Sequence, residues 1–130
     1  MKYLVDTDTA SYFIGGRPRV VSKFLAHSQN WMISAITYHE LVQGLILAKN
    51  PRIEEQISAF LQDVEVVEFA SSDALESGRL AALLKKAGTP IGYHDTMIAG
   101  HALSLKATLI SNNTKHFSMV PELMLENWAK

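Results

Sequence analysis

The sequence predicts an α/β fold with a mainly parallel sheet of four to five strands. Short apolar segments alternate with longer segments of helical periodicity along the chain, which is typical of parallel strands joined by crossover helices. Hydrophobic residues make up 48% of the chain and charged residues 19%, as in an ordinary folded protein. The length of 130 residues fits one domain. We therefore expect residues 1–130 to form a single domain around one core.

Four short strands are expected where brief apolar runs are bounded by turn or helix signals. They lie at residues 2–5, 31–33, 64–67 and 108–110. The tail at 122–128 is a candidate for a fifth strand.

Helices are expected between these strands. The first ends at Gly15 and Gly16, and Pro18 opens the second, because glycine commonly follows the end of a helix and proline suits its first turn. The remaining helices are expected at roughly 36–50, 51–61, 71–87 and 95–106.

The composition excludes several kinds of protein. The chain has no cysteine, so disulfides, thiolate catalysis and cysteine-bound metal sites are excluded. No signal-peptide core precedes Asp6, and no run approaches the roughly 18 apolar residues of a membrane helix. We therefore expect a cytoplasmic protein without a membrane partner.

The formal net charge of −1 rules out a strongly basic DNA-coating protein. If metal ions hold three of the 13 carboxylates, however, 10 free acids face 12 Lys and Arg residues. The charge balance therefore leaves a phosphate-rich partner open.

Polar side chains follow the expected strands on one side of the sheet. Asp6 and Asp8 come directly after the first strand, and Ser111 to Asn113 follow the fourth. Asp95 begins the helix that leads into the fourth strand. Because ligands of parallel sheets bind beyond the carboxyl ends of the strands, we expect these residues to converge.

Two acids lie among residues typical of a core. Asp95 heads an apolar stripe that continues through Ile98 and Ala102, and Glu40 adjoins Leu41. Buried carboxylates are costly and raise one another's pKa, and a divalent cation relieves both problems. Oxygen ligands favour Mg²⁺ or Mn²⁺, which can activate phosphodiester hydrolysis. Taken singly, each Asp could be only a helix cap and Glu40 only a solvated residue, so the site hypothesis depends on their joint order.

Four segments, in this order, resemble the PIN-domain ribonucleases and, more narrowly, the VapC toxins of bacterial toxin–antitoxin pairs. The segments are 3–8, 33–41 with Gly44, 90–99 and 109–117. The resemblance implies a three-layer α/β/α domain and a Mg²⁺- or Mn²⁺-dependent endoribonuclease, often acting on a structured RNA such as a tRNA. It also implies a homodimer and inhibition by a cognate VapB-like antitoxin.

The resemblance also implies roles for individual residues. By matching position, the catalytic, metal-binding acids are Asp6, Glu40 and Asp95. Asn113 stands at the fourth catalytic position, with Ser111 supporting it. Two departures from the family pattern leave the number of metal ions open: Asp8 replaces a usual asparagine, and Asn113 stands where aspartate is common.

Candidate RNA-binding residues are Lys115, His116 and Arg17, since cationic side chains near the site could hold the RNA backbone. His39 and His94 adjoin proposed ligand acids in the sequence. Adjacent residues of a helix do not face each other, so we do not expect either histidine to contact its neighbouring acid.

Two other functions compete with the nuclease. A phosphatase of the haloacid-dehalogenase type would use Asp6 as nucleophile and Asp8 as general acid, but the residues after the fourth strand lack the acidic pair that it needs for magnesium. The second is a catalytically inactive PIN-fold binding module. The asparagines at 112 and 113 favour it, and three retained acids count against it.

From the repulsion expected between the acids, Asp95→Asn should abolish cleavage and leave folding intact or improved. A folded Asp95→Asn variant that cleaves RNA at the normal rate would contradict the assignment of this residue.

Overall fold

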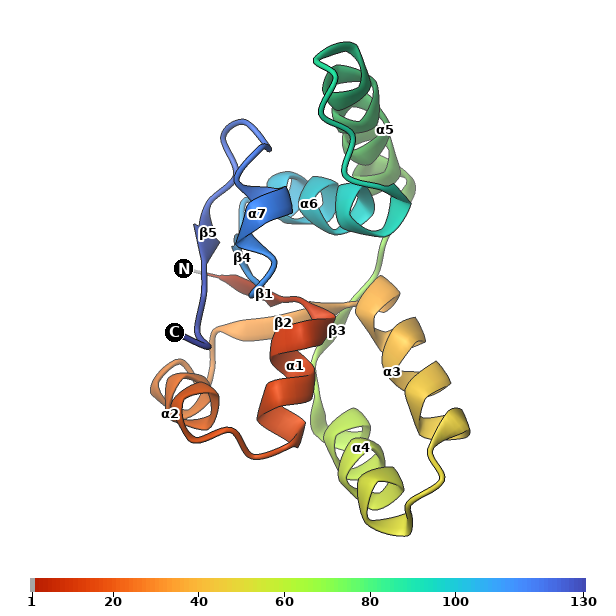
Figure 1. Cartoon of the computed structure of the whole chain (residues 1–130), viewed down its shortest axis with the longest axis vertical. Coiled ribbons are helices and arrows are strands. Elements are labelled where there is room, and N and C mark those ends of the chain that lie inside the picture. The colour runs from red at the N-terminus through yellow and green to blue at the C-terminus, as the bar shows by residue number, and fades with distance from the viewer. Residues whose placement is uncertain (1) are drawn as a thin grey trace.

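The computed structural model describes residues 2–130, in which five parallel strands form one sheet (Figure 1). Their order across the sheet is β3-β2-β1-β4-β5. The strands are β1 (Tyr3–Val5), β2 (Trp31–Ser34), β3 (Val66–Val67), β4 (Thr108–Ile110) and β5 (Leu125–Glu126). The predicted α/β class is confirmed, and the two outer strands are shorter than the segments expected from the sequence.

Seven helices surround the sheet within residues 2–130. They are α1 (Thr7–Ile14), α2 (Pro18–Ala26), α3 (Ala35–Leu47), α4 (Pro51–Asp63), α5 (Ser71–Lys86), α6 (Tyr93–Leu105) and α7 (Thr114–Phe117). In this described part of the chain, no helix is both long and apolar enough to cross a bilayer.

The expected helix at 95–106 begins two residues earlier, at Tyr93. The cause is Gly92, which precedes the helix with a φ of 90°, a conformation that glycine adopts without steric cost. Asp95 therefore lies in the first turn of α6 instead of capping it. The four-residue helix α7 was not expected, because it is too short to produce a helical period.

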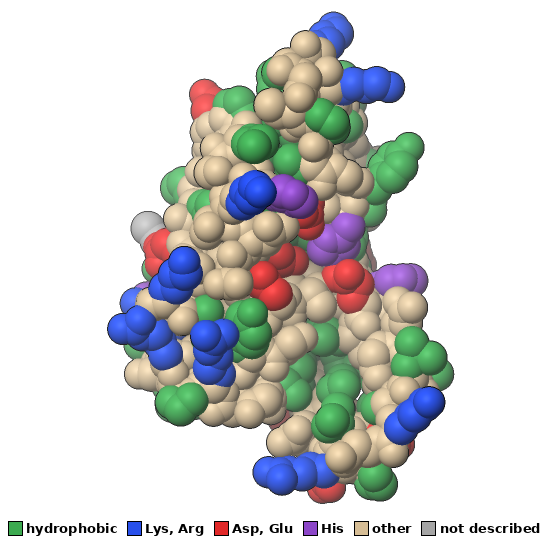
Figure 2. Space-filling model, viewed as in Figure 1, with side chains coloured by type: hydrophobic (Ala, Val, Ile, Leu, Met, Phe, Trp, Pro, Cys, Tyr) green, Lys and Arg blue, Asp and Glu red, His purple; other side chains and the backbone are tan. Residues whose placement is uncertain are grey.

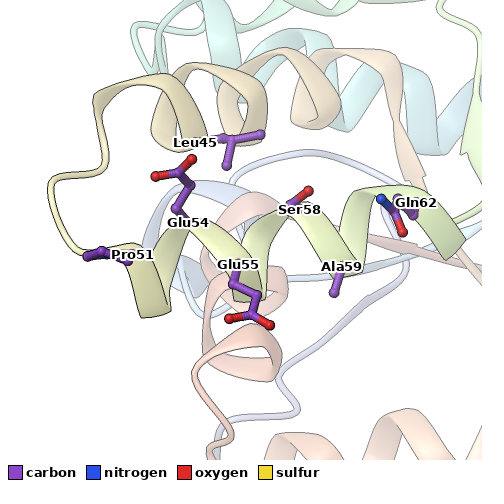
Figure 3. Close-up of a pocket in the computed structure, with 7 residues that line it drawn as sticks. All are labelled: Leu45, Pro51, Glu54, Glu55, Ser58, Ala59 and Gln62. Atoms are coloured by element: carbon purple, nitrogen blue, oxygen red, sulfur yellow. The ribbon is translucent and has the colours of Figure 1, made fainter.

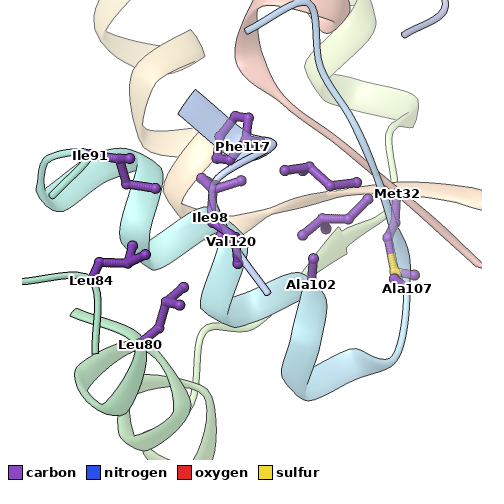
Figure 4. Packing of buried hydrophobic residues seen from close by; sticks show 12 residues of the cluster. Met32, Leu80, Leu84, Ile91, Ile98, Ala102, Ala107, Phe117 and Val120 are labelled. Atoms are coloured by element: carbon purple, nitrogen blue, oxygen red, sulfur yellow. The ribbon is translucent and has the colours of Figure 1, made fainter. Parts of the chain in front are cut away.

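Alternate residues of the strands divide the core into two layers. Leu4, Met32 and Leu109 point to one face of the sheet, where they pack with apolar residues of α5 and α6 (Figure 4). Tyr3 and Val5 point to the other face. This alternation is the normal period of a β-strand.

The second face is covered mainly by α1, α2 and α4 (Figure 1). Phe13 and Phe24 stack with ring centroids 4.1 Å apart, and Trp128 packs edge-on against Phe24 at 5.3 Å. His27 stacks on Trp128 at 5.2 Å and so belongs to this aromatic core. Helices on both faces of the sheet confirm the three-layer α/β/α architecture.

The two helices α5 and α6 pack most closely in the first layer. A Cβ atom at Gly100 would lie 2.5 Å from the Cα atom of Ser77. Because the obstructing atoms belong to the backbone of α5, a side chain at this position would force the helices apart.

We predict that Gly100→Ala lowers the free energy of unfolding by roughly 1–3 kcal/mol, through overpacking against α5. Gly78→Ala is the matched control, because Gly78 lies in α5 with open space around its Cα. That change should stabilise the protein by about 0.5–1 kcal/mol through helix propensity. Urea denaturation measures both, and equal effects of the two alanines would contradict the close approach.

Candidate active site

The carboxyl ends of β1, β2 and β4 lie side by side at the centre of the sheet. Asp6 follows β1 and caps α1, where its Oδ1 accepts a hydrogen bond of 2.8 Å from the Thr7 amide. Ser34 ends β2 and caps α3, the helix that carries Glu40. Strand ends and helix N-termini therefore place the polar groups at one edge, as the sequence predicts.

Asp6 is buried, with 5% of its surface exposed. Its Oδ2 accepts a 2.9 Å hydrogen bond from the Ser111 hydroxyl. Burial, followed by the charge of Asp8, raises the pKa of Asp6 to about 6, although the bonds from Thr7 and Ser111 act against the shift. The nearby charge of His94 also lowers the pKa of Asp6, but it does not offset the burial and the charge of Asp8.

Asp8 is bound to the loop that follows β4. Its Oδ2 accepts a 3.1 Å hydrogen bond from the Asn112 amide and lies 3.4 Å from the Ser111 hydroxyl. Asp8 thus fixes this loop to α1 while adding negative charge beside Asp6. The Asn113 amide donates to the Ser111 hydroxyl over 3.0 Å.

Asp95 is held by three neighbours. The Asn113 side-chain amide donates to its Oδ2 over 3.0 Å, and His116 Nδ1 lies 2.9 Å from the same oxygen. His94 Nδ1 lies 3.1 Å from Oδ1. Burial would raise the pKa of Asp95, but the hydrogen bonds and charges of the two histidines outweigh it and lower the pKa.

His94 joins the two acids that lie on helices. Its Nε2 lies 2.7 Å from Glu40 Oε1, and Glu40 also accepts a hydrogen bond from the Thr7 hydroxyl. The hydrogen bond with Asp95 raises the pKa of His94 to about 9, against burial and assisted by the charges of Glu40 and Asp6. Our expectation that His94 does not contact its sequence neighbour was wrong, because the imidazole and the Asp95 carboxylate come within hydrogen-bonding distance in the first turn of α6.

These contacts form a closed ring around the site. Its members, in order, are Asp6, Ser111, Asn113, Asp95, His94, Glu40 and Thr7. The ring brings together the four predicted catalytic residues and the two supporting ones, since Asp8 also contacts Ser111. Sequence analysis missed Thr7 and His94, and no local pattern marks either residue.

The donor chemistry of this ring fits a hard divalent cation, since three carboxylates converge and the pKa of Asp6 stays raised despite the charge of His94. As the side chains stand, no three Asp, Glu or His residues within 2–130 enclose a position for a metal ion. Glu40 and Asp95 are turned toward His94 instead. Binding of a cation would therefore require these two side chains to reorient toward Asp6.

Acidic and histidine side chains gather near the middle of one face of the molecule, and most Lys and Arg side chains of that face lie toward its margins (Figure 2). His116 belongs to this group because it contacts Asp95. Lys115, the preceding residue of α7, is exposed. Arg17 lies beyond the far end of α1 from Asp6, with its guanidinium 4.5 Å from the Tyr12 ring centroid. No recorded contact joins Arg17 to the ring of site residues.

Two hollows lie away from the acids. One runs along α4 and includes Leu45, Pro51, Glu54 and Gln62 in its lining (Figure 3). The other, more apolar, lies between α5 and α6. Neither is lined by Asp6, Glu40 or Asp95.

Comparison with known proteins agrees with this arrangement. Residues 3–123 match the family model described as the PIN domain. The chain is 32% identical to the tRNA(fMet)-specific endonuclease VapC of Salmonella typhimurium, over 99% of both proteins. It is 35% identical to ribonuclease VapC1 of Haemophilus influenzae, over the full length of both. The chain belongs to the VapC group of the PIN-domain family.

Solved structures of VapC proteins share this PIN fold. The DNA-bound VapBC of Salmonella typhimurium superposes with a TM-score of 0.91 at 32% identity, over 98% of both chains. VapBC2 of Rickettsia felis, bound to a DNA fragment from its promoter, gives 0.89 at 32% identity over 98% of this chain and 99% of that one. The family assignment thus rests on sequence and on fold.

We predict that Asp6→Asn stabilises the protein in EDTA by about 1–3 kcal/mol at pH 8. The pKa of Asp6 is about 6 in the folded protein and near its ordinary value of 3.8 in the unfolded chain, so its ionisation destabilises the fold as the pH rises between these values. The gain should disappear below about pH 4, where the carboxyl is protonated in both states. Thermal unfolding between pH 4 and 8 measures it, and a gain independent of pH would contradict the cause given.

Asp95→Asn is the matched comparison. The low pKa of Asp95 shows that its charge is stabilised by His94 and His116. Of the two outcomes expected for Asp95→Asn, intact or improved folding, these contacts favour the first, and we expect no gain in stability from it at pH 8.

Proposed function

We propose that this protein is a metal-dependent endoribonuclease of the VapC type. The observation that carries the proposal is the closed ring of contacts that joins Asp6, Glu40 and Asp95 at the carboxyl ends of the central strands. Support also comes from relatives that are named as ribonucleases and match the whole chain.

In this proposal Asp6, Glu40 and Asp95 hold Mg²⁺ or Mn²⁺. When bound, the cation supplies an activated water and neutralises charge on the scissile phosphate. Asn113 orients Asp95, and Ser111 orients Asp6 through the hydroxyl that also receives the Asn113 amide. Asp8 keeps the loop after β4 in place. The number of ions stays open.

The proposed substrate is RNA, with a tRNA as the first candidate because one relative is named for tRNA(fMet). His116 of α7 contacts Asp95, and the exposed Lys115 precedes it in the same helix, so both could meet the phosphate backbone. Arg17 is a weaker candidate for RNA binding, since it lies at the distant end of α1.

We also propose that a VapB-like antitoxin inhibits the protein and that the chain forms a homodimer. The support for the antitoxin is that the similar structures from Salmonella typhimurium and Rickettsia felis are of VapBC proteins. The homodimer and the cytoplasmic location stay predictions from the sequence.

The alternatives are weaker. The phosphatase hypothesis is not favoured, because the chain has the PIN fold and Asp8 is committed to the loop after β4. An inactive binding module would not explain why three carboxylates converge or why Asp6 is buried at the cost of a raised pKa.

We predict that the purified chain cleaves a pool of tRNA and ribosomal RNA into discrete fragments with Mg²⁺ or Mn²⁺, and that EDTA abolishes the reaction. Asp6→Ala should lower the rate by roughly 100-fold or more, as the loss of a metal ligand removes several kcal/mol of transition-state stabilisation. Gel analysis of labelled RNA measures both effects.

The matched control is Asp63→Ala, which removes an exposed carboxylate at the end of α4 and should leave the rate unchanged. Cleavage that persists in EDTA, or in Asp6→Ala, would contradict the metal mechanism. Release of phosphate from a small monoester without any RNA cleavage would favour the phosphatase.

A further inference from the structure

Two side-chain contacts connect α3 to α6. Near the start of α6, His94 Nε2 lies 2.7 Å from Glu40 Oε1. Seven residues later, His101 Nδ1 lies 2.9 Å from the hydroxyl of Ser34, the cap of α3. Because seven residues make about two helical turns, both histidines lie on the same face of α6. The two contacts therefore connect the helices at two levels. We call the His94–Glu40 contact the outer rung and the His101–Ser34 contact the inner rung.

Backbone packing does not provide this connection. The closest partner of α6 is α5, and that of α3 is α4. Within residues 2–130, α3 and α6 are not among the closely packed pairs of elements. Each helix is attached separately to the sheet, α3 through β2 and α6 through β4. The two side-chain contacts join the helices that carry Glu40 and Asp95 directly to one another.

The inner rung is fully buried, since Ser34 and His101 both have 0% exposure. The Ser34 oxygen accepts a 3.0 Å hydrogen bond from the Ile36 amide, so its own proton is free to go to His101 Nδ1. Burial lowers the pKa of His101, although the Asp73 charge and the Glu68 backbone oppose it. A neutral ring that accepts at Nδ1 carries its proton on Nε2.

Asp73 stands behind this ring. Its Oδ2 lies 3.7 Å from His101 Nε2, an atom that no close hydrogen bond occupies. Asp73 is itself fixed by the Ala70 amide at 2.7 Å and the Ser104 hydroxyl at 2.6 Å. The carboxylate therefore offers a fixed negative group to the Nε2 side of the imidazole, which favours one ring orientation.

We propose that Ser34, His101 and Asp73 form a positioning unit that sets the separation of α3 and α6, and thereby allows Glu40 and Asp95 to bind one metal site together. The metal part of this inference rests on the proposed function. His101 is a positioning residue, because it is wholly buried and contacts neither proposed ligand. His101 acts through the helices: its contact with Ser34 fixes the spacing of α3 and α6, and this spacing sets the separation of Glu40 and Asp95.

The first test is Mn²⁺ binding to the full chain, measured by electron paramagnetic resonance at a temperature well below unfolding. We expect His101→Leu and Ser34→Ala each to raise the dissociation constant about 10-fold, as loss of supporting groups does at other metal sites. The double variant should bind no more weakly than the weaker single variant, since both changes break one rung. His101→Gln should restore most of the affinity, because its amide can accept from Ser34 and donate toward Asp73.

The control for lost stability is Leu84→Ala, which opens the core on α5 and removes neither of the two contacts between α3 and α6. This variant should unfold at a lower temperature and bind Mn²⁺ as the wild type does. Unchanged Mn²⁺ affinity in His101→Leu, or an equal loss in Leu84→Ala, would overturn the positioning role.

The second test does not involve metal. Since the chain has no cysteine, nitroxide labels can be placed through Ile46→Cys on α3 and Tyr93→Cys on α6, positions that are 76% and 90% exposed. The distribution of label distances should shift or broaden in His101→Leu but not in Leu84→Ala. An unchanged distribution would overturn the positioning unit, whereas failure of the wild type to bind Mn²⁺ would overturn the proposed metal site, so the two failures are distinguishable.

Discussion

The crowding of carboxylates at the end of a parallel sheet is the constraint around which this protein is organised. Like charges in a poorly solvated place repel and favour protonation. The two acids differ in their contacts: Asp95 contacts two histidines, whereas Asp6 accepts hydrogen bonds only from neutral donors. Burial and the charge of Asp8 raise the pKa of Asp6, and its neutral donors lower it too little to offset them.

The scaffold distributes the acids over elements of different rigidity. Asp6 follows a central strand whose position is set by the sheet and by two core layers. Glu40 and Asp95 lie on helices, and helices move more easily relative to one another than hydrogen-bonded strands do. In the proposed arrangement, the contacts of His101 with Ser34 and of His94 with Glu40 therefore help to set the geometry of the site.

The sequence predicted the α/β fold class and the grouping of Asp6, Asp95 and Asn113, because parallel strands bring their carboxyl ends to one edge. The three-layer order and the place of Glu40 in the group came from the family resemblance. The sequence did not predict the contact of His94, which depends on where α6 begins and hence on the φ of Gly92.

The hydrogen bond between Asp8 and the loop after β4 could not be predicted from the sequence either, since the two residues are 104 positions apart along the chain. Local patterns report how a residue relates to its neighbours in the chain. Long-range hydrogen bonds and the reach of a side chain across a gap need the packed structure, and these two features decided the details of the site.

The pairing of β1 with β4 has a consequence for how the protein is made. Tyr3 aligns with Thr108, and Asp6 bonds to Ser111 across a separation of 105 residues. The first acid of the site is synthesised about a hundred residues before the strand and loop that hold it. The centre of the sheet therefore cannot close on a growing chain until β4 and Ser111 have left the ribosome, and the site stays incomplete up to that point.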